Sequence, residues 1–257
     1  MKMIFFVIKE LLELLFRLVS RLFVKKPDII LTEIHRNGYL VIDKFLSNQD
    51  CGHLRSLIDA KLDDVNVKRW TDELGSDNRL YYAEELHDDF RSILNNNMLN
   101  GVLNKLIGVK DPVKMLLAQR VDSKEGNIGS GGGWHRDSPT THQYKFLIYL
   151  SDVEIDNGPF EYIVGSQRKF EILGSVFSGS FKPGQYRYNN QEIQNYLMKN
   201  KRVSDTKIVG RAGTLVIVDT KGIHRGAPIL AHSRYTLFGY YWRDEIPYHM
   251  RPQSIYN

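Results

Sequence analysis

The chain has 257 residues, 42% of them hydrophobic and 11% aromatic, with a formal net charge of +5 and a single cysteine, Cys51. This length can bury one substantial core, and one cysteine excludes an internal disulfide and fits the reducing cytoplasm. The basic residues are scattered rather than clustered among aromatics, and no phosphate loop or dinucleotide fingerprint occurs, which argues against nucleic-acid binding and nucleotide-driven chemistry.

Residues 1–26 are predicted to form an amphipathic N-terminal helix, because their polar side chains fall within about one third of a helical wheel and the rest is apolar. Charges interrupt the segment too often for a membrane-spanning helix, and no cleavage pattern of a secretory signal follows it. Three alternatives stay open for residues 1–24: they lie on the cytoplasmic face of a membrane, dock on a partner or second copy, or pack on their own domain. We favour the membrane surface.

A single domain is expected over residues 27–257, beginning at Pro27. Helical patterns lie mainly before residue 108 and include a helix over 50–62, which Ser47 and Asp50 are expected to cap. Runs rich in β-branched and aromatic residues follow and predict strands at 113–120, 144–150, 160–164, 214–218 and 235–242. This segregation of helices and strands predicts the α+β class.

The most informative motif is His135-Arg136-Asp137, which a glycine-rich loop at 130–133 precedes. Residues two apart on an extended strand project to the same side, so His135 and Asp137 can hold one ion while Arg136 points away. His224 is the candidate third ligand. Two histidines and one carboxylate on one face of an octahedron leave three positions open, as in non-haem Fe(II) oxygenases.

A second motif follows His224 by ten residues, in the strand-like run that contains Arg234 and Thr236. These two residues share a face of the strand, and a guanidinium beside a hydroxyl suits the carboxylate of an organic diacid. An exposed arginine paired with an acidic side chain is the simpler interpretation if the motif is taken without the metal ligands.

These residues together resemble the phytanoyl-CoA dioxygenase-like branch of the Fe(II)/2-oxoglutarate-dependent oxygenases, over roughly residues 36–245. The resemblance implies a double-stranded β-helix, a cupin-like jelly roll with N-terminal helices packed on the barrel. The segments that carry it, in chain order, are 38–46, 135–137, 157–166, 212–219 with His224, and 234–236.

The resemblance also implies an activity and its cofactors. Fe(II) is expected on His135, Asp137 and His224, and 2-oxoglutarate on Arg234 and Thr236, with Gln119 as a further candidate contact. Dioxygen is the other cosubstrate, and 2-oxoglutarate is converted to succinate and carbon dioxide. Halogenating relatives lack the carboxylate ligand, whereas this chain keeps it, so hydroxylation of a C–H bond is the expected outcome.

The substrate is expected to be a small molecule or a lipid-like compound, and the sequence does not select among these. Desaturation, cyclisation, epimerisation and a catalytically silent binding module stay open as alternatives, as does the oligomeric state. Residues 165–206 are predicted to form an insertion over the active site, with a helix at 191–201. Candidate substrate contacts are Lys182, Tyr186 and Arg187 in this insertion and Trp70, Arg79, Tyr81 and Tyr82 in residues 63–97.

Overall fold

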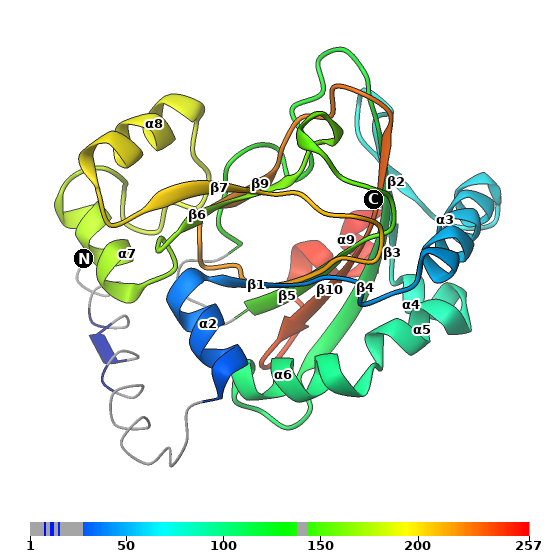
Figure 1. The fold of residues 1–257 in the computed structure, drawn as a ribbon, viewed down its shortest axis with the longest axis horizontal. Coiled ribbons are helices and arrows are strands. Elements are labelled where there is room, and N and C mark those ends of the chain that lie inside the picture. The colour runs from blue at the N-terminus through cyan, green and yellow to red at the C-terminus, as the bar shows by residue number, and fades with distance from the viewer. Residues whose placement is uncertain (1–7, 9–10, 13–14, 16–27, 138–142, 257) are drawn as a thin grey trace.

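Two antiparallel sheets form the centre of the molecule (Figure 1). The larger sheet contains, in spatial order, β1 (Tyr39–Ile42), β8 (Leu215–Asp219), β5 (Gln143–Tyr149), β10 (Ser233–Trp242), β4 (Val113–Asp122), β3 (Asp77–Tyr81) and β2 (Trp70–Thr71). The smaller sheet contains β7 (Ser204–Ile208), β6 (Phe160–Val164) and β9 (His224–Gly226). The structure is a computed structural model, and it describes residues 8, 11, 12, 15, 28–137 and 143–256.

The alternation of side chains along the strands explains how the larger sheet is covered on both faces. In β5, Tyr144, Phe146 and Ile148 join the core cluster under the helices, whereas Leu147 and Tyr149 join a second cluster that reaches Phe160 and other residues of the smaller sheet. The side chains between the two sheets therefore come from every second residue of the central strands. This interior face is where the predicted cosubstrate residues lie.

Helices cover the opposite face of the larger sheet (Figure 1). They are α2 (Ile29–Asn37), α3 (Asn48–Asp63), α4 (Ala83–Leu86), α5 (Asp88–Leu94) and α6 (Asn97–Ile107). The predicted cap of α3 is present, because Ser47 accepts from the amide of Asp50 while the Asp50 carboxylate accepts from the amide of Ser47. The apolar side of these helices buries Leu54, Phe90 and Leu103 against the sheet.

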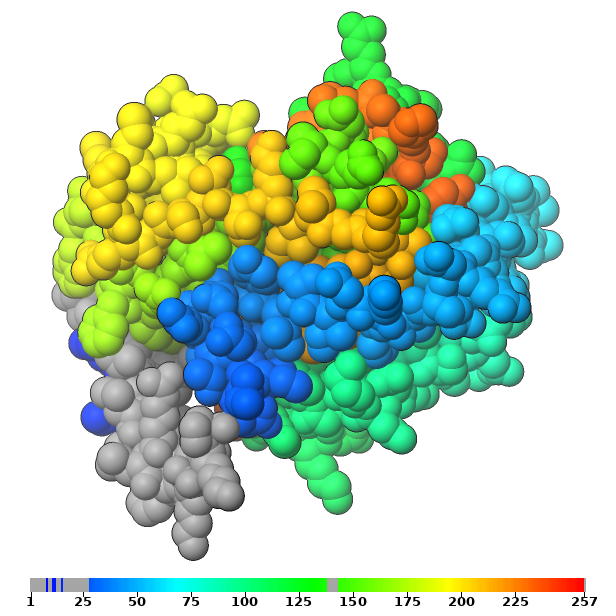
Figure 2. Space-filling model, in the orientation of Figure 1, coloured from blue at the N-terminus to red at the C-terminus, as the bar shows by residue number. Residues whose placement is uncertain are grey.

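The segment between β6 and β7 forms a lobe of its own. It contains α7 (Lys169–Phe177) and α8 (Asn190–Lys199), which lie beside the smaller sheet in Figure 1 and make the yellow-green and yellow lobe of Figure 2. The remaining short elements are the 3-10 turns η1 (Ile155–Asn157) and η2 (Tyr248–Met250) and the helix α9 (Pro252–Ile255).

The predicted α+β jelly roll is confirmed, and each predicted strand matches an observed strand with ends shifted by up to two residues. Several elements escaped prediction: the hairpin of β2 and β3, the short strands β7 and β9, and the helix α7. Of the helices after residue 108, α8 corresponds to the helix predicted at 191–201, whereas α7 was not predicted. The strands that escaped prediction are short or rich in polar residues, so their sequences lack a clear apolar alternation.

The prediction for residues 1–26 lies almost wholly outside the described residues. The four residues of this segment that are described, Ile8, Leu11, Leu12 and Leu15, are about half exposed or more, at 50%, 48%, 63% and 59%. Within the described part of the chain, no helix combines the length and apolar character needed to cross a bilayer.

Candidate functional site

The two predicted histidine ligands lie side by side because their backbones pair directly. The amide of His135 donates to the carbonyl of His224 at 2.9 Å, and the amide of His224 donates to the carbonyl of His135 at 2.8 Å. His135 forms a second bridge with Arg187 on its other side. Residues directly opposite in an antiparallel pair project from the same face. Isolated bridges, rather than the expected continuous strand, thus turn both imidazoles to one side.

Asp137 completes a group of three possible metal ligands. One nitrogen or oxygen atom from each of His135, Asp137 and His224 lies within 4.8 Å of the others. The Asp137 Oδ1 is 3.7 Å from His135 Nε2 and 3.9 Å from His224 Nε2. Two bonds of about 2.1 Å to a common ion span at most about 4.2 Å, so atoms at these separations are within reach of one shared metal. Arg136 points away, as predicted, and hydrogen-bonds Tyr188 and two backbone carbonyls.

A backbone carbonyl orients each of the two imidazoles. The Nδ1 of His135 is 2.9 Å from the carbonyl of Gly133, and the Nδ1 of His224 is 2.9 Å from the carbonyl of Gly222. A carbonyl oxygen can only accept a hydrogen bond, so each Nδ1 must carry the proton. Each Nε2 is then unprotonated, and its lone pair is available to a metal ion shared with Asp137. This is the tautomer that binds a metal ion.

Lys145 is the closest cation to this group and was not predicted. It comes from β5, on the interior face, and its Nζ lies 2.7 Å from Asp137 Oδ2 and 4.2 Å from the ring centre of Tyr240. The ammonium thus takes one carboxylate oxygen and leaves Oδ1 facing the two histidines. Such an arrangement favours binding of a metal through a single oxygen of Asp137.

The electrostatics of the cluster favour the metal-binding protonation states. The pKa of His224 is lowered to about 3, mainly by burial and then by the neighbouring His135, and the smaller effect of Asp137 raises it only in part. Burial also lowers the pKa of His135. Burial raises the pKa of Asp137, but Lys145 and the two imidazoles outweigh this effect and hold it well below its usual range. At neutral pH both imidazoles are therefore neutral and the carboxylate is ionised.

An inner pocket of about 600 Å³, counting the space open to solvent, extends from the histidines into the space between the sheets. Arg234, Thr236 and Gln119 line it, and they are only 2%, 1% and 1% exposed. The register explains their convergence, because Thr236 on β10 is directly opposite Gln119 on β4, and Arg234 lies two residues along the same face. The rest of the wall is mostly apolar and includes Leu117, Leu147, Val218 and Phe238.

The polar atoms of this pocket are left partly without partners. Within the described residues, Arg234 Nε, Thr236 Oγ1 and Gln119 Oε1 are buried and make no hydrogen bond. A buried polar group without a partner costs about 1–3 kcal/mol, so native proteins retain such groups where a ligand satisfies them. The inner pocket is thus a cradle for a compact anion with several oxygen atoms.

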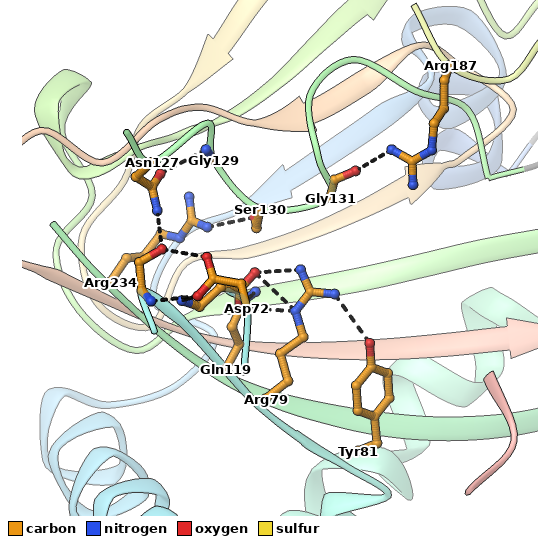
Figure 3. A network of polar contacts seen from close by, with 12 residues as sticks. Asp72, Arg79, Tyr81, Gln119, Asn127, Gly129, Ser130, Gly131, Arg187 and Arg234 are labelled. Atoms are coloured by element: carbon orange, nitrogen blue, oxygen red, sulfur yellow. Dashed lines mark hydrogen bonds and ion pairs between the residues drawn. The ribbon is translucent and has the colours of Figure 1, made fainter. Parts of the chain in front are cut away.

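A network of polar contacts holds the cradle in place (Figure 3). Arg234 donates to the Ser130 hydroxyl at 2.8 Å, and Gln119 donates to Asp77 at 2.7 Å. Asp77 also pairs with Arg79 at 2.5 Å, so the inner residues connect to the hairpin of β2 and β3. The residues around the cradle are therefore positioned before any ligand arrives.

The glycine-rich loop forms the wall next to His135. Gly131 has a φ of +86°, and a Cβ added there would lie 2.5 Å from the Cε1 of His135. Gly129 has a φ of +85°, and its Cβ would lie 2.0 Å from the carbonyl oxygen of Gly226. Only glycine fits these positions, because the backbone is left-handed and the neighbouring atoms leave no room.

A second, outer pocket also borders the metal-binding group, and His135 and Asp137 line it. It encloses about 1600 Å³, counting the space open to solvent. Its lining comes from parts of the chain far apart in sequence: the hairpin, the insertion between β6 and β7, the end of β10 and the C-terminal turn. The side chains that face it include Arg79, Tyr81, Tyr186, Arg187, Tyr240, Trp242 and Met250.

The structure places some of the predicted substrate contacts in the outer pocket and others elsewhere. Tyr186, Arg187, Arg79 and Tyr81 line the outer pocket, whereas Lys182 lines only a small separate hollow beside α7. Sequence reasoning missed Lys145, Ser130 and Asp77. A lysine inside an otherwise apolar strand was the signal available for Lys145, since lysine is rarely buried without a partner.

The sequence matches the model of the phytanoyl-CoA dioxygenase (PhyH) family over residues 34–234. Ectoine dioxygenase of Halomonas elongata is 25% identical over 76% of this chain, and the match spans 63% of that protein, slightly under two thirds of its length. L-proline trans-4-hydroxylase of Streptomyces griseoviridis is 24% identical over 74% of this chain and 76% of that protein.

Similar solved structures support the fold. The non-haem α-ketoglutarate-dependent carbocyclase SnoK from nogalamycin biosynthesis superposes with a TM-score of 0.64 at 16% identity, covering 85% of each chain. At this identity the likeness concerns the architecture alone.

Proposed function

The chain belongs to the phytanoyl-CoA dioxygenase (PhyH) family, and from this we infer that it is an Fe(II)- and 2-oxoglutarate-dependent dioxygenase that hydroxylates a C–H bond of a small molecule. The observation that carries the proposal is the convergence of His135, Asp137 and His224 at the mouth of a pocket whose buried donors lack partners. The names of the two relatives, a dioxygenase and a hydroxylase, point to the same reaction class.

We assign Fe(II) to His135 Nε2, His224 Nε2 and Asp137 Oδ1. Three protein ligands on one side leave the remaining positions for the cosubstrates. The carbonyls behind each imidazole fix the ring, and Lys145 holds the second oxygen of Asp137 away from the ion. The two carbonyls are supporting partners of the kind that raise the affinity and precision of a metal site.

We assign 2-oxoglutarate to the inner pocket. It carries two carboxylates, and the guanidinium of Arg234 at the far end offers the fork that matches one of them. Thr236 presents to the same space a hydroxyl that can donate to a carboxylate. Gln119 lines the pocket too, but its amide nitrogen donates to Asp77 and its free amide oxygen can only accept, so it offers no donor to an anion. Leu117, Leu147, Val218 and Phe238 exclude water, which strengthens the ion pair with Arg234.

When bound, iron and 2-oxoglutarate supply the oxidising chemistry, in which dioxygen accepts two electrons from 2-oxoglutarate and two from the substrate, leaving succinate, carbon dioxide and an alcohol. One oxygen atom enters succinate and the other enters the substrate. The protein's own contribution is to fix the metal ligands, to orient the cosubstrate through Arg234, and to hold the substrate C–H bond in the outer pocket.

The test begins without dioxygen. Addition of Fe(II) and 2-oxoglutarate to the protein should produce the weak visible charge-transfer band of the chelate, and His135→Ala should abolish it. Arg234→Ala should keep metal binding but raise the 2-oxoglutarate concentration needed by more than tenfold. Arg211→Ala is the matched control, because that guanidinium is 81% exposed on the surface and should change nothing.

Admission of dioxygen completes the test. We expect slow formation of succinate from 2-oxoglutarate even without substrate, and faster formation with it. Metal binding without any band or succinate would instead indicate a catalytically silent binding module. That outcome would refute the proposed activity while leaving the family assignment intact.

A second candidate reaction is ring closure or desaturation, which the likeness to the carbocyclase SnoK keeps in view. The same ligands serve these outcomes, because all begin with removal of hydrogen from carbon. Product mass separates them: hydroxylation adds one oxygen atom, whereas ring closure and desaturation remove two hydrogen atoms.

For residues 1–24 we keep the proposal of a peripheral position on the cytoplasmic face of a membrane. It is supported by the exposure of Ile8, Leu11, Leu12 and Leu15, which are apolar. Deletion of residues 1–26 should move the protein from the membrane fraction to the soluble fraction. An unchanged distribution would refute the anchor.

A further inference from the structure

We propose that the outer pocket selects a substrate that carries a carboxylate, and that Arg187 binds this carboxylate beside the metal centre. The inference rests on the proposed function and specifies its substrate class. It depends on three observations: the register that brings Arg187 next to His135, the charge of the pocket lining, and the aromatic wall opposite.

Backbone pairing positions Arg187. The amide of Arg136 donates to the carbonyl of Tyr186 at 2.7 Å, and the amide of Tyr188 donates to the carbonyl of Trp134 at 2.9 Å. The insertion thereby adds a short strand-like segment to the metal-binding motif, with Arg187 directly opposite His135. Opposite residues share a face, so Arg187 projects to the side on which the ligands lie.

The side chain is held but keeps donors for a ligand. Its Nη1 donates to the carbonyl of Gly131 at 2.8 Å, in the loop beside His135 (Figure 3). Within the described residues, Nε and Nη2 of Arg187 make no hydrogen bond. A guanidinium anchored at one corner and free on another edge can still offer two parallel donors to a carboxylate.

Charge compensation separates Arg187 from the other cations of the outer pocket. Arg79 pairs with Asp77 at 2.5 Å, and Lys145 pairs with Asp137 at 2.7 Å. No acidic group in the part of the chain that the structure describes forms an ion pair with Arg187. The neighbouring residues 138–142, which lie outside that part, contain no Asp or Glu. The pocket thus keeps an uncompensated positive charge close to the metal.

The wall of the pocket suits the body of such a substrate. Tyr240 and Trp242 stack at the end of β10, with ring centres 5.6 Å apart, and both face the pocket. Met250 adds a further apolar side chain. A carboxylate on an apolar or aromatic body therefore matches the cation and the wall together.

The experiment uses the full chain loaded with Mn(II) and saturated with 2-oxoglutarate, so that the inner pocket is filled. Phenylacetate is the probe, and phenylacetamide is its neutral counterpart of the same shape. Broadening of the probe's proton signals by Mn(II), compared with the Zn(II)-loaded protein, reports binding close to the metal. We expect phenylacetate to bind at least tenfold more tightly than phenylacetamide.

Variants assign the effect to Arg187. Arg187→Gln should reduce phenylacetate binding to the level of the amide, and Arg187→Lys should restore part of it. Lys182→Gln is the matched control, because Lys182 is an exposed cation of the same insertion that does not line the outer pocket. Competition with inorganic phosphate or sulfate separates a preference for carboxylates from binding of any oxyanion.

Each failure has its own signature. If 2-oxoglutarate does not bind the metal-loaded protein, the proposed function is wrong. If it binds, but phenylacetate shows no broadening, equals phenylacetamide, or is unaffected by Arg187→Gln, the carboxylate inference is wrong and the oxygenase proposal stands. Displacement of phenylacetate by phosphate or sulfate at equal concentration would also overturn the carboxylate preference.

Discussion

The inner and outer pockets both border the proposed metal ligands, yet they are built differently. Arg234, Thr236 and Gln119 of the inner pocket lie on long paired strands and are almost fully buried. The outer pocket uses the insertion between β6 and β7, the hairpin and the C-terminal turn, and Tyr186 within it is 56% exposed.

This difference in construction matches the two proposed roles, binding of a constant cosubstrate and binding of a variable substrate. Strand registers position the inner residues to within the precision of a hydrogen-bond ladder, which suits a cosubstrate that is always the same. Segments outside the ladders tolerate change in length and sequence, which suits substrates that differ between relatives. Changes in the inner pocket should therefore alter metal and 2-oxoglutarate binding, and changes in the outer pocket should alter the choice of substrate.

Among the changes considered, Lys145→Met should have the largest effect on the metal-binding group. Removal of the ammonium leaves Asp137 buried without its partner, so the free energy of unfolding of the metal-free protein should fall by about 3 kcal/mol. The metal should then bind more tightly, because a cation that repels it has gone. Urea denaturation with and without Mn(II) measures both effects.

The control for Lys145 is Lys105→Met, which removes an exposed ion pair with Asp28 and should cost less than about 1 kcal/mol. Weaker metal binding in Lys145→Met would show that orientation of Asp137 by Lys145 outweighs charge repulsion. It would then contradict the sign predicted here.

Gly131→Ala tests the wall that both pockets share. The new methyl group would meet the imidazole of His135, so metal affinity should fall by about 50-fold. Gly133→Ala is the matched control: its φ is also +86°, but no atom lies within 4 Å of the added Cβ. Equal losses of metal affinity in the two variants would assign the effect to backbone strain rather than to displacement of His135.

The metal-binding residues and most residues of the inner pocket could be predicted from the sequence, because they occur in short local patterns. Residues two apart on a strand share a face, so His135 with Asp137 and Arg234 with Thr236 could be paired without coordinates. Gln119 followed from the family resemblance, and the register with Thr236 explains its position. The central strands were predicted from local information as well, since each is a run rich in β-branched, aromatic and other apolar residues.

The lining of the outer pocket could not be predicted from such local patterns. The pairing of Arg187 with His135 joins residues from separate loops, and no periodicity in either segment encodes it. Lys182 and Arg187 have the same charge and lie five residues apart, yet only Arg187 reaches the outer pocket. The partner of Lys145 also depends on the registers of β5 and the metal-binding motif, which only the folded chain defines.

Glu84→Gln tests the support of β4 where its pairing with β3 ends, beside Leu117 in the wall of the inner pocket. The Glu84 carboxylate accepts from the amide of Leu116 at 2.9 Å, just beyond Leu117, where the pairing of β4 with β3 ends. Burial raises the pKa of Glu84 from 4.5 to about 7, so the folded state holds a proton that the unfolded state releases between these values. Stability is therefore lost as pH rises through 7.

Glutamine cannot ionise, so Glu84→Gln should match the parent at pH 4 and exceed its free energy of unfolding by about 2 kcal/mol at pH 8.5, after allowance for partial exposure. Urea denaturation of the metal-free protein at both pH values checks this. Glu85→Gln, an exposed neighbour on the same helix, should show no such difference. A constant gap between Glu84→Gln and the parent across this pH range would contradict the assignment.

The smallest expected effect comes from Thr236→Val, which removes a buried hydroxyl that bonds nothing among the described residues. The shape is kept, so stability without ligand should stay the same or rise slightly, while affinity for 2-oxoglutarate should fall about fivefold. Tyr186→Phe removes a hydroxyl from the outer pocket and should leave that affinity unchanged. Calorimetric titration of both Mn(II)-loaded variants with 2-oxoglutarate measures the two affinities. An equal loss of affinity in the two variants would contradict the division between an inner pocket that binds 2-oxoglutarate and an outer pocket that does not.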